Sequence, residues 1–219
     1  MSKMIEVKGV TKSYGDVTPV EDMNLHIQEG EFTSIVGPSG SGKTTLLNLI
    51  AGLLTPTQGE IVADGVSLYE LSQRDRVAFR RKNFGFVFQA FNLIPYFTAM
   101  ENVQIPLYLA GVKEKEQASL GRELLEKVGL EDKDSRFPAQ LSTGEQQRVA
   151  IARALANNPR VIFADEPTGN LDAKNGAEVM TYIEELNGKG VTIILVTHDS
   201  DMADFARRKI ELVDGRLSL

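Results

Sequence analysis

Cysteine is absent from the 219 residues of this chain, and histidine occurs only twice. Without cysteine there are no disulfide bonds and no thiolate metal sites, which fits a reducing compartment. No stretch reaches the about 18 consecutive apolar residues that a membrane-spanning helix needs, and residues 1–10 lack the apolar run of a secretory signal. We therefore expect a cytoplasmic protein that reaches a membrane only through a partner.

The chain also lacks an excess of positive charge. Its net charge is −6 at pH 7, so no overall basic field attracts nucleic acid or anionic lipid, and we expect no nucleic-acid partner. The hydrophobic fraction of 42% and the charged fraction of 25% are those of an ordinary globular protein. The length suits one large domain or two closely associated subdomains.

Strand patterns dominate both ends of the chain. Alternating apolar and polar residues over 4–14 and 23–30 predict antiparallel strands with one solvated face. A turn at Asp64-Gly65 joins two further strand segments. Short apolar runs, typical of buried strands in a mostly parallel sheet, occur at 32–37, 84–88, 161–165 and 191–197.

Helix patterns dominate the middle of the chain, from about 90 to 157. The first predicted helix begins at a capping box formed by Thr98 and Glu101, and Pro106 should kink or break it. The second carries Leu120, Leu124, Leu125 and Val128 along one stripe. The predicted fold is therefore α/β, with a mostly parallel sheet core, an N-terminal antiparallel β subdomain and an inserted α-helical subdomain.

The stretch GPSGSGKTT (37–45) matches the pattern G-x-x-x-x-G-K-[ST] between a predicted strand and a predicted helix. Glycines let successive backbone amides point inward at a helix N-terminus, which forms a cradle for phosphates. The alternative is a ligand-free Gly/Ser-rich turn, which the flanking strand and helix disfavour. Lys43 would reach the β- and γ-phosphates, and the Thr44 hydroxyl would bind Mg²⁺. The predicted nucleotide site consists of Gly37, Pro38, Ser39, Gly40, Ser41, Gly42, Lys43, Thr44 and Thr45.

A second chemical motif lies at the end of the strand VIFAD, where Asp165 and Glu166 are adjacent. Parallel sheets place ligand chemistry at the carboxyl ends of their strands. Asp165 would hold Mg²⁺ through water, and Glu166 would orient or deprotonate an attacking water. A solvated strand end is the alternative for an isolated Asp-Glu pair, but it is weak beside a phosphate-binding loop.

The stretch LSTGEQQRVAIARAL (141–155) completes a resemblance to the ATP-binding cassette (ABC) transporter ATPases, whose signature is LSGGQ followed by a helix. Further family motifs follow in order along the whole chain, at Tyr14, the glycine loop, Gln89, the signature, Asp165-Glu166, Asp172 and His198. The resemblance implies a P-loop NTPase (RecA-like) fold and a single ABC ATPase domain over 1–219. In that domain 1–89 and 158–219 form the nucleotide-binding core with the antiparallel β subdomain, and 90–157 form the helical signature subdomain.

The resemblance also implies a role for each motif. Tyr14 would stack on adenine, Gln89 would contact Mg²⁺ or the lytic water, and His198 would contact the γ-phosphate. A lone histidine after a strand is more often structural, but the glycine loop reverses that expectation. The implied activity is ATP hydrolysis by Lys43, Gln89, Glu166 and His198, with ATP and Mg²⁺ as cofactors and with Thr44, Gln89 and Asp165 as metal ligands. Ser142, Thr143, Gly144 and Glu145 would face the ATP of a second copy, so that two chains sandwich two ATP molecules head to tail.

The signature departs from the family pattern at two positions. It has Ser-Thr-Gly-Glu where the family usually has Ser-Gly-Gly-Gln. Thr143 adds a β-branched side chain, and Glu145 adds negative charge, where close approach to phosphate is expected. Because Ser142 and Gly144 are retained, we expect an active enzyme in which Thr143 and Glu145 point away from the phosphate.

Apolar residues also follow Gln89. Packing within the helical subdomain is one interpretation of this segment. As a group the side chains instead favour a groove for a partner's helix, which in ABC systems is the coupling helix of a transmembrane permease subunit. The residues concerned are Phe91, Leu93, Ile94, Tyr96 and Phe97.

The stretches FQAFNLIP, ENV and ADEPTGNLD, with a short C-terminus, resemble the ATPases of lipoprotein-release, macrolide-export (MacB-like) and cell-division (FtsE-like) systems. The favoured function is the ATPase subunit of such a complex, peripheral on the inner face of the cell membrane. Alternatives are an FtsE-like mechanotransmission ATPase without transport, or a soluble ABC ATPase acting on DNA or ribosomes. Soluble members usually carry two cassettes or long inserts. A nucleotide-binding module without turnover is disfavoured by the presence of Glu166 and His198.

Overall fold

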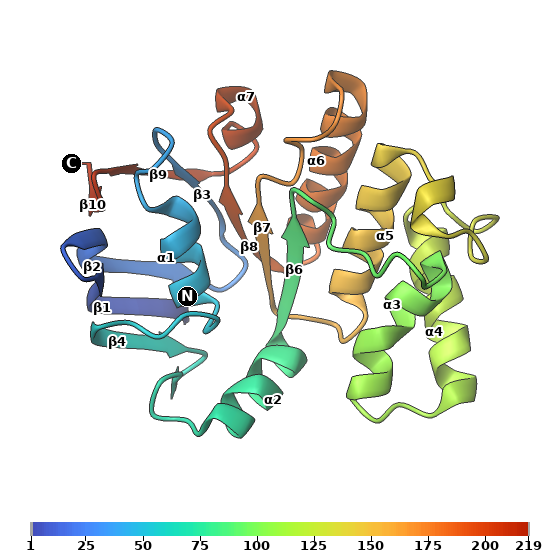
Figure 1. Cartoon of the computed structure of the whole chain (residues 1–219), viewed down its shortest axis with the longest axis horizontal. Helices are drawn as coiled ribbons and strands as arrows, with labels where there is room; N and C mark the ends of the chain where they lie inside the picture. Colours follow the sequence, from blue (N-terminus) through green and yellow to red (C-terminus); the bar gives the residue numbers. More distant parts are fainter. Residues whose placement is uncertain (1, 219) are drawn as a thin grey trace. The chain divides into compact units, whose positions relative to one another are not determined.

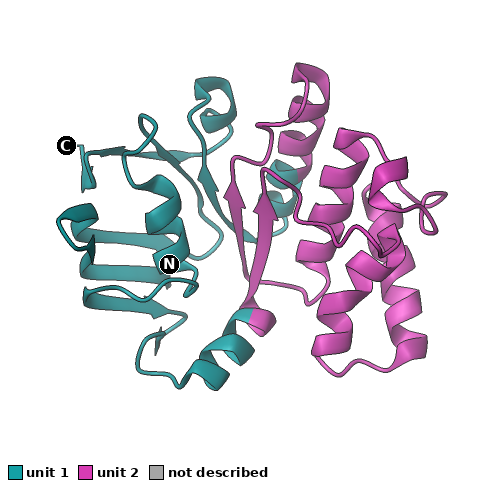
Figure 2. Ribbon diagram, in the orientation of Figure 1, with its two compact units in different colours: residues 1–80, 183–219 teal, residues 81–182 magenta. Residues whose placement is uncertain are grey.

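The computed structural model describes residues 2–218 and divides into two compact units (Figure 2). Unit 1 is made of the residues up to Arg80 and from Ile183 onward, and unit 2 is Arg81–Tyr182. This division follows backbone packing, whereas the division by role at residues 89 and 157 stays a prediction. Within residues 2–218, no helix combines the length and the apolarity that a bilayer crossing requires.

Unit 1 contains a four-stranded antiparallel sheet with the strand order β2-β1-β4-β5. A left-handed backbone at Asp64 and Gly65, with φ values of 49° and 76°, joins β4 to β5, which confirms the predicted turn. The predicted antiparallel pairing at the start of the chain is also confirmed, because β1 pairs with both β2 and β4. The strands are β1 (Lys3–Tyr14), β2 (Val17–Gln28), β4 (Gln58–Ala63) and β5 (Val66–Ser67).

Unit 1 also holds the parallel strands that carry the glycine loop. β3 (Phe32–Val36) lies between β8 (Thr192–Val196) and β9 (Arg208–Val213) and runs parallel to both. All of β8 is buried, as its continuous apolar sequence predicts for a strand covered on both faces. The short β10 (Arg216–Leu217) pairs antiparallel with β9. α1 (Lys43–Ile50) follows the loop and packs on β8 and β2 (Figure 1).

Unit 2 combines two parallel strands with a group of helices. β6 and β7 pair in parallel, and α5 packs against β6 and against α3 and α4 (Figure 1). Of the predicted stripe, Leu124, Leu125 and Val128 are buried, and Leu120 is half-buried. The elements are β6 (Phe84–Phe88), α3 (Ala99–Leu109), α4 (Glu114–Lys127), the 3-10 helix Pro138–Gln140, α5 (Thr143–Leu155) and β7 (Val161–Asp165).

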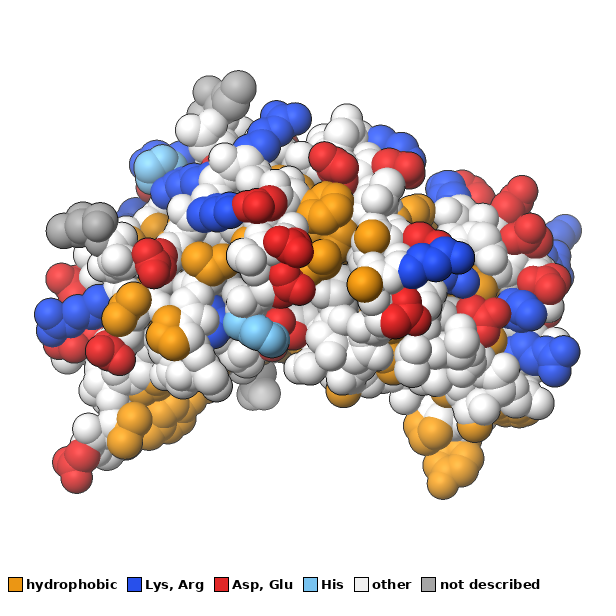
Figure 3. Space-filling view, turned by 90° about the horizontal axis from the view of Figure 1, so that it is seen from above, with side chains coloured by type: hydrophobic (Ala, Val, Ile, Leu, Met, Phe, Trp, Pro, Cys, Tyr) orange, Lys and Arg blue, Asp and Glu red, His pale blue; other side chains and the backbone are white. Residues whose placement is uncertain are grey.

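The remaining helices are α2 (Gln73–Asn83) and α6 (Ala173–Gly188), whose sequences cross the unit boundary, and the short α7 (Ser200–Ala203) of unit 1. The capping box of α3 is confirmed, but the expected break at Pro106 is wrong, since α3 continues to Leu109. Proline removes a single N–H from the helix ladder, and the Ala110 N–H donates to the Pro106 carbonyl at 3.0 Å, so the last turn still closes. Acidic and basic side chains are interspersed on the face drawn in Figure 3.

Candidate nucleotide site

Gly37 and Gly42 bound the loop between β3 and α1. Their φ values are 148° and 98°, a region that residues with a side chain rarely adopt. A Cβ atom at Gly37 would collide with the carbonyl oxygen of Leu212, and one at Gly42 would collide with that of Pro19. Both positions therefore require glycine, and the loop is a tight backbone ring lying against neighbouring strands of unit 1.

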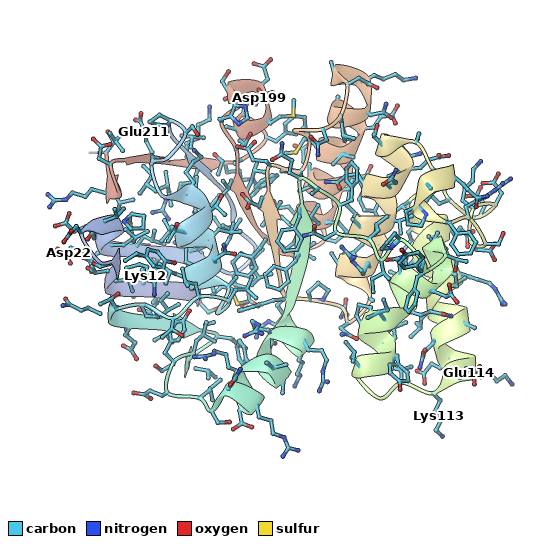
Figure 4. All side chains as sticks on the ribbon, in the orientation of Figure 1. Lys12, Asp22, Lys113, Glu114, Asp199 and Glu211 are labelled. Carbon is cyan, nitrogen blue, oxygen red and sulfur yellow. The ribbon has the colours of Figure 1, made fainter. Side chains whose placement is uncertain are left out.

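The first turn of α1 has no capping side chain of its own. Its N-cap residue is Gly42, and the turn contains no acidic residue. By contrast, α3, α5 and α7 are capped by Thr98, Ser142 and Asp199 (Asp199 is labelled in Figure 4), each with an acidic residue in the first turn. In addition, the buried Ser41 hydroxyl has no hydrogen-bond partner among the described residues. A bound phosphate would supply these missing acceptors, so the loop fits a nucleotide.

Lys43 lies inside this loop and is only 8% exposed. Its Nζ donates to the carbonyl oxygens of Gly37 at 2.8 Å and Pro38 at 2.9 Å. Both partners are neutral, so the positive charge of the ammonium is not compensated by them. A phosphate oxygen would make a stronger, charge-assisted bond to the same group.

His198 is placed beside the loop by the pairing of β3 and β8. Ile35 pairs with Val196, and the Thr197 N–H donates to the Ile35 carbonyl at 3.3 Å. The chain then turns at the exposed His198 into α7. Within unit 1, the glycine loop and His198 thus follow the carboxyl ends of adjacent parallel strands, where ligand sites of such sheets lie.

Tyr14 is the last residue of β1, and 53% of its surface is exposed. The Lys12 Nζ lies 4.8 Å from its ring centroid and donates to the Thr55 carbonyl at 2.9 Å (Lys12 is labelled in Figure 4). A cation on one side of the ring still leaves aromatic surface open to solvent. This arrangement is compatible with the predicted stacking on adenine.

In unit 2, pairing of β6 and β7 brings the other predicted residues together. Phe88 pairs with Asp165, so Gln89 and Glu166 follow directly at the same end of the two strands. The Gln89 side chain lies over Gly169, because a Cβ there would be 2.7 Å from Gln89 Nε2. The Asn170 Nδ2 also donates to the Gln89 carbonyl at 2.8 Å. The glutamine is therefore fixed against the loop that follows Glu166.

Glu166 itself has a left-handed backbone, with φ of 48°. Such a conformation costs about 1–3 kcal/mol and is found where the surroundings enforce it. The next residue, Pro167, is held by Gln147 of α5, whose buried Nε2 donates to the Pro167 carbonyl. Sequence analysis misses Gln147, although its spacing from the buried Ala150 and Ile151 places it on the core face of the helix.

The signature residues form the N-terminus of α5, and two of them cap it. The Ser142 Oγ accepts from the Glu145 N–H at 3.2 Å, and the Glu145 carboxylate accepts from the Ser142 N–H at 2.8 Å. The hydrogen bond from the Ser142 backbone is the main cause that lowers the pKa of Glu145, helped by its hydroxyl and by Lys133 and Arg148. Glu145 is thus engaged by its own helix, while Thr143 is exposed.

Gly144 packs against the first turn of α6. A Cβ at Gly144 would lie 2.5 Å from Asn175 Oδ1. Asn175 is fixed by Asp172, whose carboxylate accepts from the Asn175 backbone at 2.9 Å and from its side chain at 2.6 Å. These bonds lower the pKa of Asp172. The signature therefore packs closely on the Asp172 turn, and a larger residue at position 144 would require the Asn175 side chain to move.

The candidate residues fall into two sets. Unit 1 carries Tyr14, the glycine loop 37–45 and His198, whereas unit 2 carries Gln89, the signature residues 142–145, Asp165 and Glu166. Among residues 2–218, no group of three or more His, Asp or Glu side chains could hold a metal ion together. Proteins usually hold Mg²⁺ with one or two carboxylates plus substrate phosphates, and the Asp165 carboxylate of unit 2 and the Thr44 hydroxyl of unit 1 are each donors of a type that Mg²⁺ takes. The catalytic and metal-binding roles of the candidate residues in both units remain predictions.

Comparison with known proteins gives concordant findings. A family model described as ABC transporter matches residues 20–169. The chain is 50% identical over 218 residues to the ABC transporter ATP-binding protein MJ1508 of Methanocaldococcus jannaschii, covering 98% of this chain and 97% of the relative. It is 46% identical over 215 residues to the lipoprotein-releasing system ATP-binding protein LolD of Bacteroides fragilis, covering 98% and 100%. A dimeric structure of the cassette MJ0796, also from M. jannaschii, bound to ADP and Pi, matches with a TM-score of 0.91 at 45% identity, covering 99% and 97% of the two chains.

Proposed function

The chain belongs to the ABC transporter ATP-binding family as an ATP-hydrolysing subunit, and we propose that two copies enclose two MgATP head to tail and drive a membrane partner. The observation that carries the proposal is the N-terminus of α1, which has no side-chain cap and follows a loop that requires glycine at positions 37 and 42. That site has a buried Ser41 hydroxyl with no hydrogen-bond partner among the described residues and a lysine bonded to two neutral carbonyls, groups that a triphosphate complements.

Each composite site would take different groups from the two copies. One copy supplies the phosphate cradle, with Lys43 on the β- and γ-phosphates. Thr44, Gln89 and Asp165 would hold Mg²⁺, which offsets phosphate charge when bound. The other copy supplies the amides and hydroxyl at Ser142.

The proposed chemical step is general-base hydrolysis. Glu166 accepts a proton from the attacking water or orients it, with its position set by Gln147 on the adjacent Pro167. His198, at the end of the strand paired with β3, would contact the terminal phosphate. ATP supplies the phosphoanhydride bond that is broken.

The test is Glu166→Gln, which preserves the size of the side chain but removes its basicity. We expect hydrolysis to fall by roughly two or more orders of magnitude while ATP binding persists, so that an ATP-locked dimer accumulates in gel filtration with light scattering. Glu184→Gln makes the same change at an exposed position on α6 and should behave as wild type. Unchanged hydrolysis in Glu166→Gln, or a monomer under ATP, would contradict the proposal.

The membrane partner would bind residues 91–97, which we call the docking segment. Tyr96 is 85% exposed, and Ile94 and Phe97 are each 38% exposed, an unusual apolar surface for so short a segment. Burying it under a helix stabilises association by about 25 cal/mol per Å² of apolar area, less the cost of association. We propose a transmembrane permease subunit of lipoprotein-release or macrolide-export type, which places this chain on the inner face of the cell membrane.

Replacing Tyr96 and Phe97 together by serine tests the docking segment. The variant should fail to co-purify with the membrane subunit and should lose partner-stimulated ATP turnover, because the apolar contact is gone. Tyr108→Ser with Leu109→Ser is the matched control, since these residues are 71% and 56% exposed at the other end of α3. Wild-type co-purification of the Tyr96/Phe97 variant, or equal loss in the control, would place the docking surface elsewhere.

A further inference from the structure

The docking segment begins with two residues in an unfavourable backbone conformation. Phe91 and Asn92 have φ values of 58° and 49°, the left-handed region, and neither is glycine. Successive non-glycine residues persist there only where their surroundings hold them. The contacts that hold them therefore determine how the segment is presented.

Besides backbone hydrogen bonds from the Phe91 and Asn92 N–H groups to the carbonyls of Phe88 and Ala90, side-chain contacts come from Arg153 in the last turn of α5. Its Nη2 donates to the Phe91 carbonyl at 2.7 Å, and its Nη1 donates to the Asn92 carbonyl at 2.5 Å. Burial is the cause that lowers the pKa of the Arg153 guanidinium. The guanidinium meets two successive carbonyls with a rigid, planar fork of donors, whereas a lysine would meet them with a single ammonium on a flexible stem.

The other end of the docking segment is held separately, from α3. Asn102 is fully buried; its Oδ1 accepts from the Ile94 N–H at 2.8 Å, and its Nδ2 donates to the Phe97 carbonyl at 3.0 Å. We call the hydrogen bonds from Arg153 and those of Asn102 the two clamps of the docking segment. They fix the backbone from which its apolar side chains project. Only the Arg153 clamp belongs to the helix that begins at the signature.

α5 therefore joins two functional ends. Its N-terminus at Ser142 and Gly144 is the surface proposed to meet nucleotide, and Arg153 lies about 15 Å along the same helix, at 1.5 Å per residue. We infer that Arg153 is a positioning residue that ties the docking segment to the signature helix. A displacement of α5 at its nucleotide end then moves the carbonyls of Phe91 and Asn92, and with them the surface offered to the membrane subunit. The inference deepens the proposed function and rests on it.

The first test measures the clamp in the isolated chain. Arg153→Met keeps a long side chain but removes both donors and the charge. Hydrogen exchange should become about tenfold faster or more at the amides of residues 91–98, while those in the first turns of α5 keep their wild-type rate. Exchange at residues 91–98 that does not change would overturn the clamp, whatever the membrane subunit does.

The second test measures coupling in the complex of this chain with its membrane subunit. The readout is the ratio of partner-stimulated to basal ATPase activity of the same variant, which a general loss of folded protein does not alter. We expect the ratio to fall about tenfold in Arg153→Met, with Arg153→Lys intermediate because lysine keeps the charge but lacks the rigid fork of donors. Arg148→Met makes the same change on the same helix, where the side chain lies 3.7 Å from Glu178, and should keep the wild-type ratio.

The outcomes separate the inference from the proposed function. If wild type is stimulated and Arg153→Met keeps the full ratio, the coupling role is wrong. The same holds if basal and stimulated rates fall together in proportion to thermal stability, since Arg153 is then only structural. If wild type itself is not stimulated by the membrane subunit, the proposed function fails first, and the coupling role falls with it.

Discussion

α1 and α5 both begin at glycine-containing motifs, yet their first turns are built in opposite ways. α1 starts at Gly42 without a capping side chain or an acidic residue. α5 starts at Ser142, whose hydroxyl and backbone N–H are both engaged by Glu145 in a capping box. The first turn of α1 thus has no side-chain cap, whereas that of α5 is capped within the chain.

This difference separates two kinds of phosphate contact. The turn before α1 is followed by a helix without a capping or acidic side chain, so it is suited to bind nucleotide in a single copy. The turn before α5 is closed by its own capping box. It offers a ligand the backbone N–H groups that the capping box does not engage. It is suited to join a site already occupied by nucleotide on another copy, which matches the proposed head-to-tail arrangement.

The largest effect is expected at α1. Lys43→Ala should weaken ATP binding by about a hundredfold or more, because a buried charge-assisted bond to phosphate is lost. Its cost to folding should be about 1 kcal/mol, the value of ordinary bonds to two loop carbonyls. Calorimetric titration with ATP and a thermal melt measure the two effects, with Lys8→Ala on β1 as the control. Equal ATP affinity in Lys43→Ala and wild type would remove the distinction between the two helices.

A small effect is expected at α5. Thr143→Gly with Glu145→Gln restores the usual family signature, and we expect ATPase activity to rise a few-fold at most, since Thr143 is exposed and Glu145 is turned onto its own helix. Glutamine also closes a capping box. The steady-state rate of ATP hydrolysis by the variant and by wild type measures the change in activity. A gain of about a hundredfold, roughly 2.7 kcal/mol, would show that the natural residues obstruct the composite site.

Lowering the pH should weaken the capping box between Glu145 and Ser142 and so lower the free energy of unfolding. The pKa of Glu145 is lowered from its ordinary value of 4.5, so its contribution to stability is present above that value and is lost as the pH falls through the lower, folded-state pKa. Relative to Glu145→Gln, wild type should therefore lose stability on acidification, by less than about 1 kcal/mol because the group is near solvent. Urea unfolding of both proteins at neutral and acid pH gives the difference, and an opposite sign would disprove the cap.

Local sequence patterns predict much of this molecule. The bounds of β6 and β7, the Asp64-Gly65 turn and the Thr98 capping box all come from signals within a few residues. The same capping pattern occurs at Ser142 and Glu145, although the sequence interpretation treats Glu145 only as a charge near phosphate that points away from it. Residues 173–188, which form α6, were assigned no helix.

The supporting contacts of the candidate site were not predictable in this way. Gln147 meets Pro167, and Arg153 meets Phe91 and Asn92, across 20 and about 60 residues of sequence. Such pairs depend on how helices pack on the sheet, which no local pattern determines. A partial signal existed for Arg153, a charge set among Ala and Ile in the stretch VAIARAL, where a solvent-facing residue is not expected.

The position of β3 between β8 and β9 also has a consequence for biosynthesis. The glycine loop is synthesised early, directly after β3. The two strands that pair with β3 lie within residues 192–213, which are synthesised after all of unit 2. On the ribosome β3 has neither edge paired, and the Leu212 carbonyl that confines Gly37 does not yet exist. Unit 2 can close first from contiguous residues. We therefore expect a nascent chain to capture ATP only after residues 192–213 have emerged, so that its first turnover follows completion of the folded subunit.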